Sequence, residues 1–247
     1  MIKKSIVFFL SFFLLFIPYT VRAQEPGWEP PEKNGVYDVP GKQNLKVRVF
    51  VHEPRNTPFT TDTACVDGDS SSVVDPVGWK LPLGSWTYLL NTASVPSTVG
   101  SGNLSTIAGN AFSEWENTVK NKVNFIAGTT TIDKKGLDGK NIIAWGRTSG
   151  IALAVTYTWY NSKTKLAVET DTIINKKYDW GWAGYCDNTY YDAQNILTHE
   201  LGHWIGLNDE YNSSYVDNTM YGYGSKGEIK KDTLTVGDIA GVDSLNY

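Results

Sequence analysis

The chain has 247 residues, of which 41% are hydrophobic and 19% charged, a composition that suits one ordered domain with a real core and excludes a disordered protein. Its formal net charge is −4, and loss of residues 1–23, which hold three basic and no acidic side chains, changes it to −7. An acidic protein is a poor partner for nucleic acid or anionic membranes, so we expect no nucleic-acid binding and no stable membrane anchor.

The first residues have the pattern of a targeting segment. Two lysines precede an apolar run over residues 6–17, and the small residue Ala23 follows soon after. This pattern predicts a secretory signal peptide, residues 1–23, cleaved near Ala23. A retained N-terminal anchor is the alternative. We therefore expect a secreted protein, extracellular or periplasmic.

Residues 24–78 are predicted to be an N-terminal extension, which is either a removable propeptide or a permanent part of the protein. Residues 25–44 are rich in Pro, Gly and Glu and predict an extended linker. Residues 45–52 alternate apolar and polar side chains and predict a strand. His52 at its end is alone in this strand, and we expect an ordinary exposed or packed side chain. Residues 53–78 predict a loop, and the main domain is expected over 79–247.

In the main domain, the order of predicted elements indicates an α+β fold. Residues 86–91 and 123–127 predict strands that flank an amphipathic helix of about 16 residues between Leu104 and Val119. This βαβ unit should place the two strands in a parallel sheet. Residues 141–145 predict another strand, and residues 151–160 and 166–175 predict a hairpin.

The most informative segment is His199-Glu200-Leu201-Gly202-His203. Residues four apart on a helix lie on one face, so both imidazoles can bind one zinc ion, with Glu200 placed as general base. Gly206 allows a left-handed turn after which Asp209 can return as a third ligand; its neighbour Glu210 is the alternative. Three protein ligands leave a fourth position open, which is typical of catalytic zinc.

Helix caps and cysteines add two further expectations. Asp192 is a suitable N-cap for the motif helix, and Thr235 with Asp238 predicts a capping box that begins a last helix. Cys65 and Cys186 predict a disulfide in an oxidising compartment. The alternatives are that Cys65 binds zinc in a latent precursor or that both thiols are free.

The segment from His199 to Asp209, with Met220 eleven residues on, resembles the metzincin zinc endopeptidases, in particular the matrixin-like branch of bacteria and archaea. The likeness extends over roughly residues 79–247 and includes the segments 150–154, 219–221 and 237–242. It implies a twisted, mixed sheet of about five strands, an active-site helix, a Met-turn at Met220 as an apolar floor, and a C-terminal helix.

The resemblance also implies an antiparallel edge strand, to which an extended protein or peptide substrate would add. The edge residues it implies are Ile151, Ala152, Leu153 and Ala154. The chain departs from the common pattern in three respects. Asp209 stands where most members have His, no histidines remain for a second structural zinc, and Cys65 lies outside the usual latency segment.

These observations predict a secreted zinc-dependent metalloendopeptidase. His199, His203 and Asp209 would hold one zinc ion, and Glu200 would activate water. Calcium could bind the acidic loops around Asp133 and Asp138, although no motif fixes a site. The alternatives are a non-catalytic extracellular binding module on the same fold and a zinc amidohydrolase that acts on non-protein amides.

Overall fold

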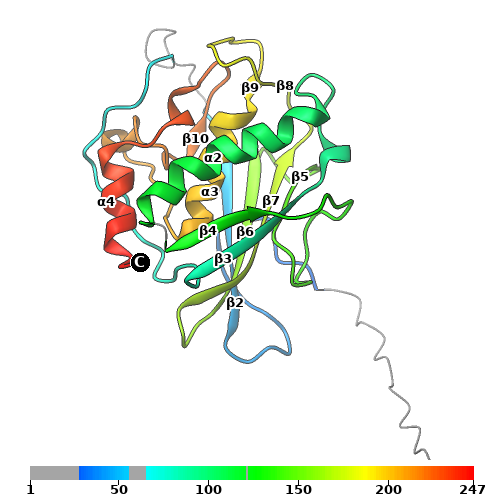
Figure 1. Ribbon diagram of the computed structural model, residues 1–247, viewed down its shortest axis with the longest axis vertical. Helices are drawn as coiled ribbons and strands as arrows, with labels where there is room; N and C mark the ends of the chain where they lie inside the picture. Colours follow the sequence, from blue (N-terminus) through cyan, green and yellow to red (C-terminus); the bar gives the residue numbers. More distant parts are fainter. Residues whose placement is uncertain (1–27, 56–64, 121) are drawn as a thin grey trace, which may run out of the picture.

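The computed structural model describes residues 28–55, 65–120 and 122–247, and the predicted signal peptide lies outside them (Figure 1). The strands in chain order are β1 Gly35–Asp38, β2 Leu45–Pro54, β3 Gly84–Leu90, β4 Val123–Ala127, β5 Ile142–Gly146, β6 Ala154–Asn161, β7 Leu166–Asn175, β8 Trp180–Gly181, β9 Tyr191–Asp192 and β10 Tyr223–Gly224. The α-helices are α2 Leu104–Thr118, α3 Ala193–Ile205 and α4 Val236–Ser244.

The protein is a mixed α/β fold in which one large sheet has the strand order β1-β2-β6-β7-β5-β3-β4, and β10 pairs with the end of β2. β3 is parallel to β4 and to β5, and α2 connects β3 to β4, so the predicted βαβ unit is confirmed. β6 and β7 form the predicted antiparallel hairpin. The five strands expected from the sequence are therefore present and lie next to one another.

The N-terminal residues change the size of the sheet. The expectation of about five strands is wrong, because the main sheet has eight strands within the described residues. The predicted linker 25–44 contains β1, which pairs with β2 from Gly35 opposite Val49 to Asp38 opposite Lys46. A strand of four residues is too short to show a periodic pattern in the sequence.

The prediction of an open substrate edge at Ile151, Ala152, Leu153 and Ala154 is also wrong for this structure. β6 lies inside the sheet, because β2 pairs antiparallel with it from Leu45 opposite Asn161 to His52 opposite Ala154. The Leu153 amide donates to the His52 carbonyl at 2.7 Å. β2 thus satisfies the backbone groups that an edge strand would offer to a peptide.

The core has two parts, one on each face of the sheet. The larger part lies under α2 and α3, which run side by side across one face (Figure 1). The smaller part lies on the opposite face, because alternate residues of a strand point to opposite sides. In β2, Phe50 belongs to the helix-covered core, whereas Val47, Val49 and Val51 belong to the other.

Cys65 and Cys186 form a disulfide, with Cα atoms 5.4 Å apart, so the predicted pairing is confirmed and Cys65 is not available as a zinc ligand. Disulfides are typical of proteins that fold in an oxidising compartment. Among the described residues, no helix is both long and apolar enough to cross a bilayer.

Candidate metal centre

Helix α3 positions the two histidines of the motif. As predicted, Asp192 caps its first turn, accepting hydrogen bonds from the Gln194 and Asn195 amides. The helix ends at Ile205, and Gly206 adopts the left-handed conformation with φ of 115°. A Cβ atom there would lie 2.5 Å from the Trp79 carbonyl oxygen. The turn therefore requires glycine for two reasons: its positive φ angle and the lack of room for a side chain.

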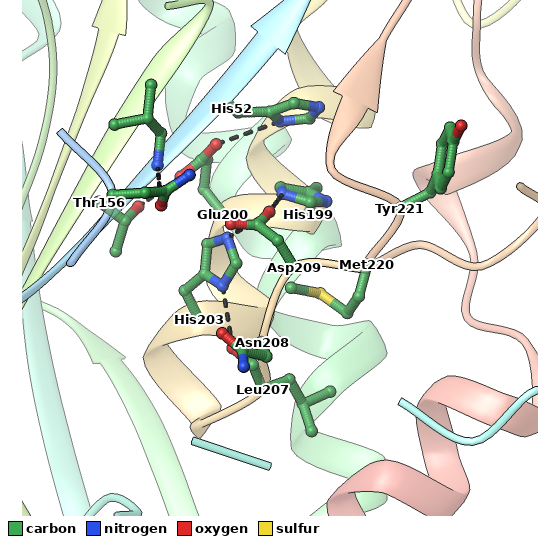
Figure 2. Close-up of polar contacts among 12 residues, drawn as sticks. His52, Thr156, His199, Glu200, His203, Leu207, Asn208, Asp209, Met220 and Tyr221 are labelled. Atoms are coloured by element: carbon green, nitrogen blue, oxygen red, sulfur yellow. Dashed lines mark hydrogen bonds and ion pairs between the residues drawn. The ribbon is translucent and has the colours of Figure 1, made fainter. Parts of the chain in front are cut away.

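The turn after Gly206 brings Asp209 back to the two histidines. Its Oδ1 lies 3.2 Å from His199 Nε2 and 3.3 Å from His203 Nε2 (Figure 2). The three residues can each offer a ligand atom to one ion, with all three atoms within 4.8 Å of one another. Glu210 is directed elsewhere, because its Oε1 accepts a hydrogen bond from the Asp75 amide. The structure therefore brings Asp209, and not Glu210, to the histidines.

The hydrogen bonds around the histidines show that this group fits a metal ion. His199 Nδ1 lies 2.7 Å from the Thr219 carbonyl and His203 Nδ1 lies 2.9 Å from the Leu207 carbonyl. A carbonyl only accepts, so each Nδ1 carries a proton, and each ring presents a lone pair at Nε2 in its neutral form. His203 Nε2 and Asp209 Oδ2 are buried and form no hydrogen bond with any described residue. With both rings neutral, three acceptors face one another, and a cation between them would stabilise this arrangement.

The spacing of these acceptors agrees with zinc. Two ligands at about 2.0–2.1 Å from a tetrahedral ion stand roughly 3.3 Å apart. The two Nε2-to-Oδ1 distances, 3.2 and 3.3 Å, are close to this value. Nitrogen and carboxylate oxygen are also ligands that zinc accepts. The described residues thus contain a group able to hold a metal ion.

Burial sets the charge of this group. It lowers the pKa of His199 to about 3, so this ring is neutral, as a metal ligand must be. Burial also disfavours the imidazolium of His203, but the Asp209 carboxylate outweighs it and raises the pKa of His203. Burial opposes ionisation of Asp209, yet the two histidines hold the pKa of its carboxyl well below the usual range.

Met220 packs against the motif helix at Gly202. It is fully buried, and a Cβ atom added to Gly202 would collide with its sulfur. The turn is fixed by Asp238, which accepts hydrogen bonds from the Thr219 and Met220 amides. Asp238 also completes the predicted capping box of α4 with Thr235, so one carboxylate links the last helix to the metal centre.

Glu200 is buried beside the three candidate ligands, and both of its carboxylate oxygens accept hydrogen bonds. The Thr156 hydroxyl donates to Oε2 at 2.5 Å, and His52 Nδ1 lies 3.2 Å from Oε1 (Figure 2). Thr156 in turn contacts Thr172, which accepts a hydrogen bond from the Trp204 indole. Burial raises the pKa of Glu200 to about 7.

His52, expected to be an ordinary exposed or packed side chain, is packed directly against the candidate site, which was not predicted. Its ring is fully buried and lies 3.9 Å from the ring of His199, between centroids. Lys231 lies in the 3-10 helix Lys230–Asp232, and its Nζ is 3.3 Å from His52 Nε2. The same ammonium donates hydrogen bonds to the Tyr221 and Tyr223 carbonyls. No signal in the sequence indicated these contacts, because a lone His in an alternating strand has no metal-ligand spacing.

Phe50, also on β2, covers the other histidine. Its ring stacks on His203 with centroids 3.8 Å apart and an interplanar angle of 7°. In this structure His199, Glu200 and His203 are 0% exposed and Asp209 is 8% exposed. The candidate site is complete but closed by β2.

The acidic loop proposed for calcium is arranged differently. Asp133 and Asp138 both form ion pairs with Lys140, whose ammonium lies between them. The groups of described residues that could hold a metal do not include them. A side chain of the protein itself thus offsets part of their charge.

No family model matches this sequence, and no curated protein matches it. Among solved structures, metalloproteinase-II from Bacteroides fragilis is similar to this chain, with 12% sequence identity and a TM-score of 0.33. The match covers 72% of this chain and 54% of the other, so the chain spans about half the length of that protein. This distant neighbour is a metalloproteinase.

Proposed function

We propose that this protein is a secreted zinc metalloendopeptidase of the matrixin-like metzincin type. One observation carries the proposal. His199, His203 and Asp209 each direct a possible ligand atom toward the same point, and the buried carboxylate of Glu200 lies beside them on the helix that holds the two histidines. A decayed site would be expected to lose this carboxylate, which a structural metal does not need.

The residues have separate roles in this proposal. A zinc ion, when bound, supplies Lewis acidity that polarises a scissile carbonyl and makes water easier to deprotonate. Glu200 takes the proton of the attacking water and returns a proton to the leaving amine. Thr156 holds the carboxylate of Glu200 in place through its 2.5 Å hydrogen bond. The substrate is a protein or peptide in extended form.

Metal analysis and a hydrolysis assay test the proposal together. The purified chain should contain one zinc per molecule, and casein or gelatin hydrolysis should stop with a chelator. The assay includes a Phe50→Ala/His52→Ala variant, because these two side chains cover the site. Zinc bound without hydrolysis of any protein in either form would favour the non-catalytic binding module. Hydrolysis confined to non-protein amides would favour the amidohydrolase.

A further inference from the structure

We propose that a cluster of basic side chains at one end of the sheet, together with an aromatic pocket beside it, binds an acidic peptide segment that contains an aromatic side chain. This inference rests on the proposed peptidase function and adds a substrate class to it. The cationic cluster consists of Lys134, Arg147, Lys176 and Lys177.

The ends of two paired strands position the cationic cluster. Gly146 ends β5 opposite Asn175, which ends β7, so Arg147 and Lys176 leave the sheet next to each other (Figure 1). The Lys176 amide donates to the Gly146 carbonyl at 2.8 Å and joins the two segments. Lys134 comes from the loop before β5, and its Cδ lies 3.7 Å from where a Cβ atom of residue 146 would be. Cations that are distant in the sequence are therefore gathered at one edge.

The cationic cluster lacks anionic partners. All four of its side chains are exposed, and none of them forms an ion pair with any residue that the structure describes. The neighbouring Lys135 differs, because it pairs with Glu29 and Glu32. Like charges held close together repel one another, and an anion placed between them relieves this repulsion. The cluster is therefore a local site for anionic groups on a chain whose formal net charge is −4.

Two hollows between these cations have the size of small side-chain sites. One has a volume of about 220 Å³ and is lined by Lys134, Lys135, Gly146, Arg147, Ile173 and Lys176. The other has a volume of about 350 Å³ and is lined by Arg147, Thr148, Asn175, Lys176 and Lys177. Arg147 and Lys176 belong to both hollows. A guanidinium can bind a carboxylate through two parallel hydrogen bonds, so the side chains of Asp and Glu suit these hollows.

An aromatic pocket of about 530 Å³ lies beside the cluster, and its aromatic lining residues are Tyr178, Trp180, Trp182 and Tyr190. Two hydrogen bonds connect its wall to the backbone around the cluster. The Tyr178 hydroxyl donates to the Ile151 carbonyl at 2.6 Å, and the Trp180 indole donates to the Asn175 carbonyl at 2.7 Å. Asp179 also lines the pocket, but it pairs with Lys226 at 2.9 Å. The pocket therefore suits an apolar or aromatic side chain of the same acidic segment.

The cluster also lies within reach of the candidate metal centre. Thr156 donates to Glu200 and stands opposite Thr172 in β7. Lys176 follows Thr172 by four positions, which is roughly 13 Å at about 3.3 Å per residue. An extended peptide with its scissile bond at Glu200 would place a side chain about four positions away at the cluster. This distance favours a peptide as the occupant over an acidic polysaccharide, because one peptide can fill the cluster and reach Glu200.

Fluorescence anisotropy tests the site on the full chain, prepared without metal so that no peptide carboxylate binds an ion at the histidines. The probe is a labelled peptide with tryptophan at its centre and three glutamates on each side, and its counterpart has glutamine in place of every glutamate. We expect the glutamate peptide to bind at least about tenfold more tightly at low salt, and the difference to shrink as salt screens the charges. Equal affinities for the two peptides would overturn the proposal.

Two double variants, both checked for folding by circular dichroism, locate the binding. Arg147→Ala/Lys176→Ala removes the cations that both hollows share and should weaken binding of the glutamate peptide about tenfold. Lys42→Ala/Lys163→Ala is the matched control, since it removes the same charge from exposed turns at the opposite end of β2 and β6. The control should bind like wild type. Equal weakening in the two variants would show that net charge, and not the cluster, attracts the peptide.

The central tryptophan of the probe tests the aromatic pocket. Alanine in its place should weaken binding to wild type about fivefold and should have little effect on Tyr190→Ala, which lacks one wall of the pocket. An equal effect on both proteins would exclude the pocket from the site. Heparin, a sulfated polysaccharide, tests the other occupant. Heparin binding that depends on Arg147 and Lys176, without binding of the glutamate peptide, would reject the acidic peptide.

Hydrolysis separates this inference from the proposed function. The Phe50→Ala/His52→Ala variant is given quenched fluorescent peptides with glutamate or glutamine about four positions from the scissile bond. We expect kcat/KM to be at least about tenfold higher with glutamate, and this preference to disappear when Arg147→Ala/Lys176→Ala is added. Hydrolysis without any preference would reject the substrate class and leave the peptidase intact. Binding of the glutamate peptide without hydrolysis of any substrate would support the acidic-peptide site and reject the peptidase.

Discussion

His52 Nδ1 and Glu200 Oε1 lie 3.2 Å apart inside the protein, although the two residues are separated by 148 positions in the chain. Both side chains are fully buried. This contact joins the N-terminal sheet strand to the helix that carries the metal motif. Because Phe50 and His52 cover the candidate site, the hydrolysis rate should be measured in the Phe50→Ala/His52→Ala variant.

Replacing Glu200 by Gln should abolish most activity and spare the metal. A positioned general base contributes about 10²–10⁴-fold to rate, and Gln keeps the size of the side chain but cannot take a proton. Hydrolysis rate and zinc content are measured on the same preparation. Glu210→Gln is the matched control, since Glu210 contacts the Asp75 amide and not the histidines. Retention of more than a tenth of the rate would contradict the role given to Glu200.

Asp209→Asn should weaken zinc binding by at least about 100-fold, because loss of a direct ligand should exceed the 10–100-fold effect of outer-shell partners. Competition with a chromogenic chelator measures the affinity. The neighbouring Glu210→Gln should bind zinc like wild type. An unchanged affinity in Asp209→Asn would mean that the turn after Gly206 does not supply the third ligand.

Thr156 and Thr158 offer a matched pair on β6, since both are fully buried. Thr156 donates to Glu200, whereas the Thr158 hydroxyl has no hydrogen-bond partner in the described part of the chain. Thr156→Val should therefore lower the free energy of unfolding by about 1–3 kcal/mol, because it leaves a buried carboxylate oxygen unpaired. Thr158→Val should be neutral or stabilising. Urea unfolding measures the free energy of unfolding of both variants. Equal decreases in the two would contradict a stabilising hydrogen bond from Thr156 to Glu200.

Glu169 should make the protein less stable as the pH rises from about 4.5 to about 7. Burial raises the pKa of Glu169 to about 7, and burial also raises the pKa of its neighbour Asp171 well above its usual value. The folded state then binds more protons than the unfolded state in this interval, so unfolding free energy falls with pH, on the order of 3 kcal/mol for Glu169.

Urea unfolding at several pH values between 4.5 and 8 measures this dependence. Glu169→Gln removes one titrating group and should make the fall with pH less steep over this interval, while Asp171 and Glu200, whose pKa values are also raised, continue to contribute. Its absolute stability can differ, because Glu169 accepts hydrogen bonds from the Asp138 and Gly139 amides. A wild-type curve that rises from pH 4.5 to 7 would contradict the prediction.

Loss of the disulfide should destabilise the fold without removing the metal. The bridge closes a loop over a sequence separation of 121, and such loops stabilise by roughly 2–5 kcal/mol. Cys65→Ser/Cys186→Ser should therefore unfold at lower urea concentration than the oxidised wild type, and reduced wild type should resemble it. Zinc content should stay the same in all three, because neither cysteine contacts the candidate ligands.

The sequence by itself determined the local parts of the site. The spacing of His199 and His203, the N-cap at Asp192 and the turn at Gly206 all depend on residues within a few positions of one another, where helix geometry and backbone sterics decide the outcome. The alternating and helical patterns likewise predicted β3 to β7, α2 and α4 close to their observed bounds. The two cysteines predicted a disulfide with two alternatives, and the structure decided between them.

Only the tertiary structure decided which strand lies beside β6 and what covers the metal centre. Alternation predicts that residues 45–52 form a strand, but it carries no information about the partner, since backbone hydrogen bonds pair any two strands of suitable shape. Burial of His52, Phe50 and Lys231 around Glu200 arises from this pairing and from the path of the chain after the Met-turn. The helix motif predicts an open catalytic site, and the long-range pairing of β2 makes it a closed one.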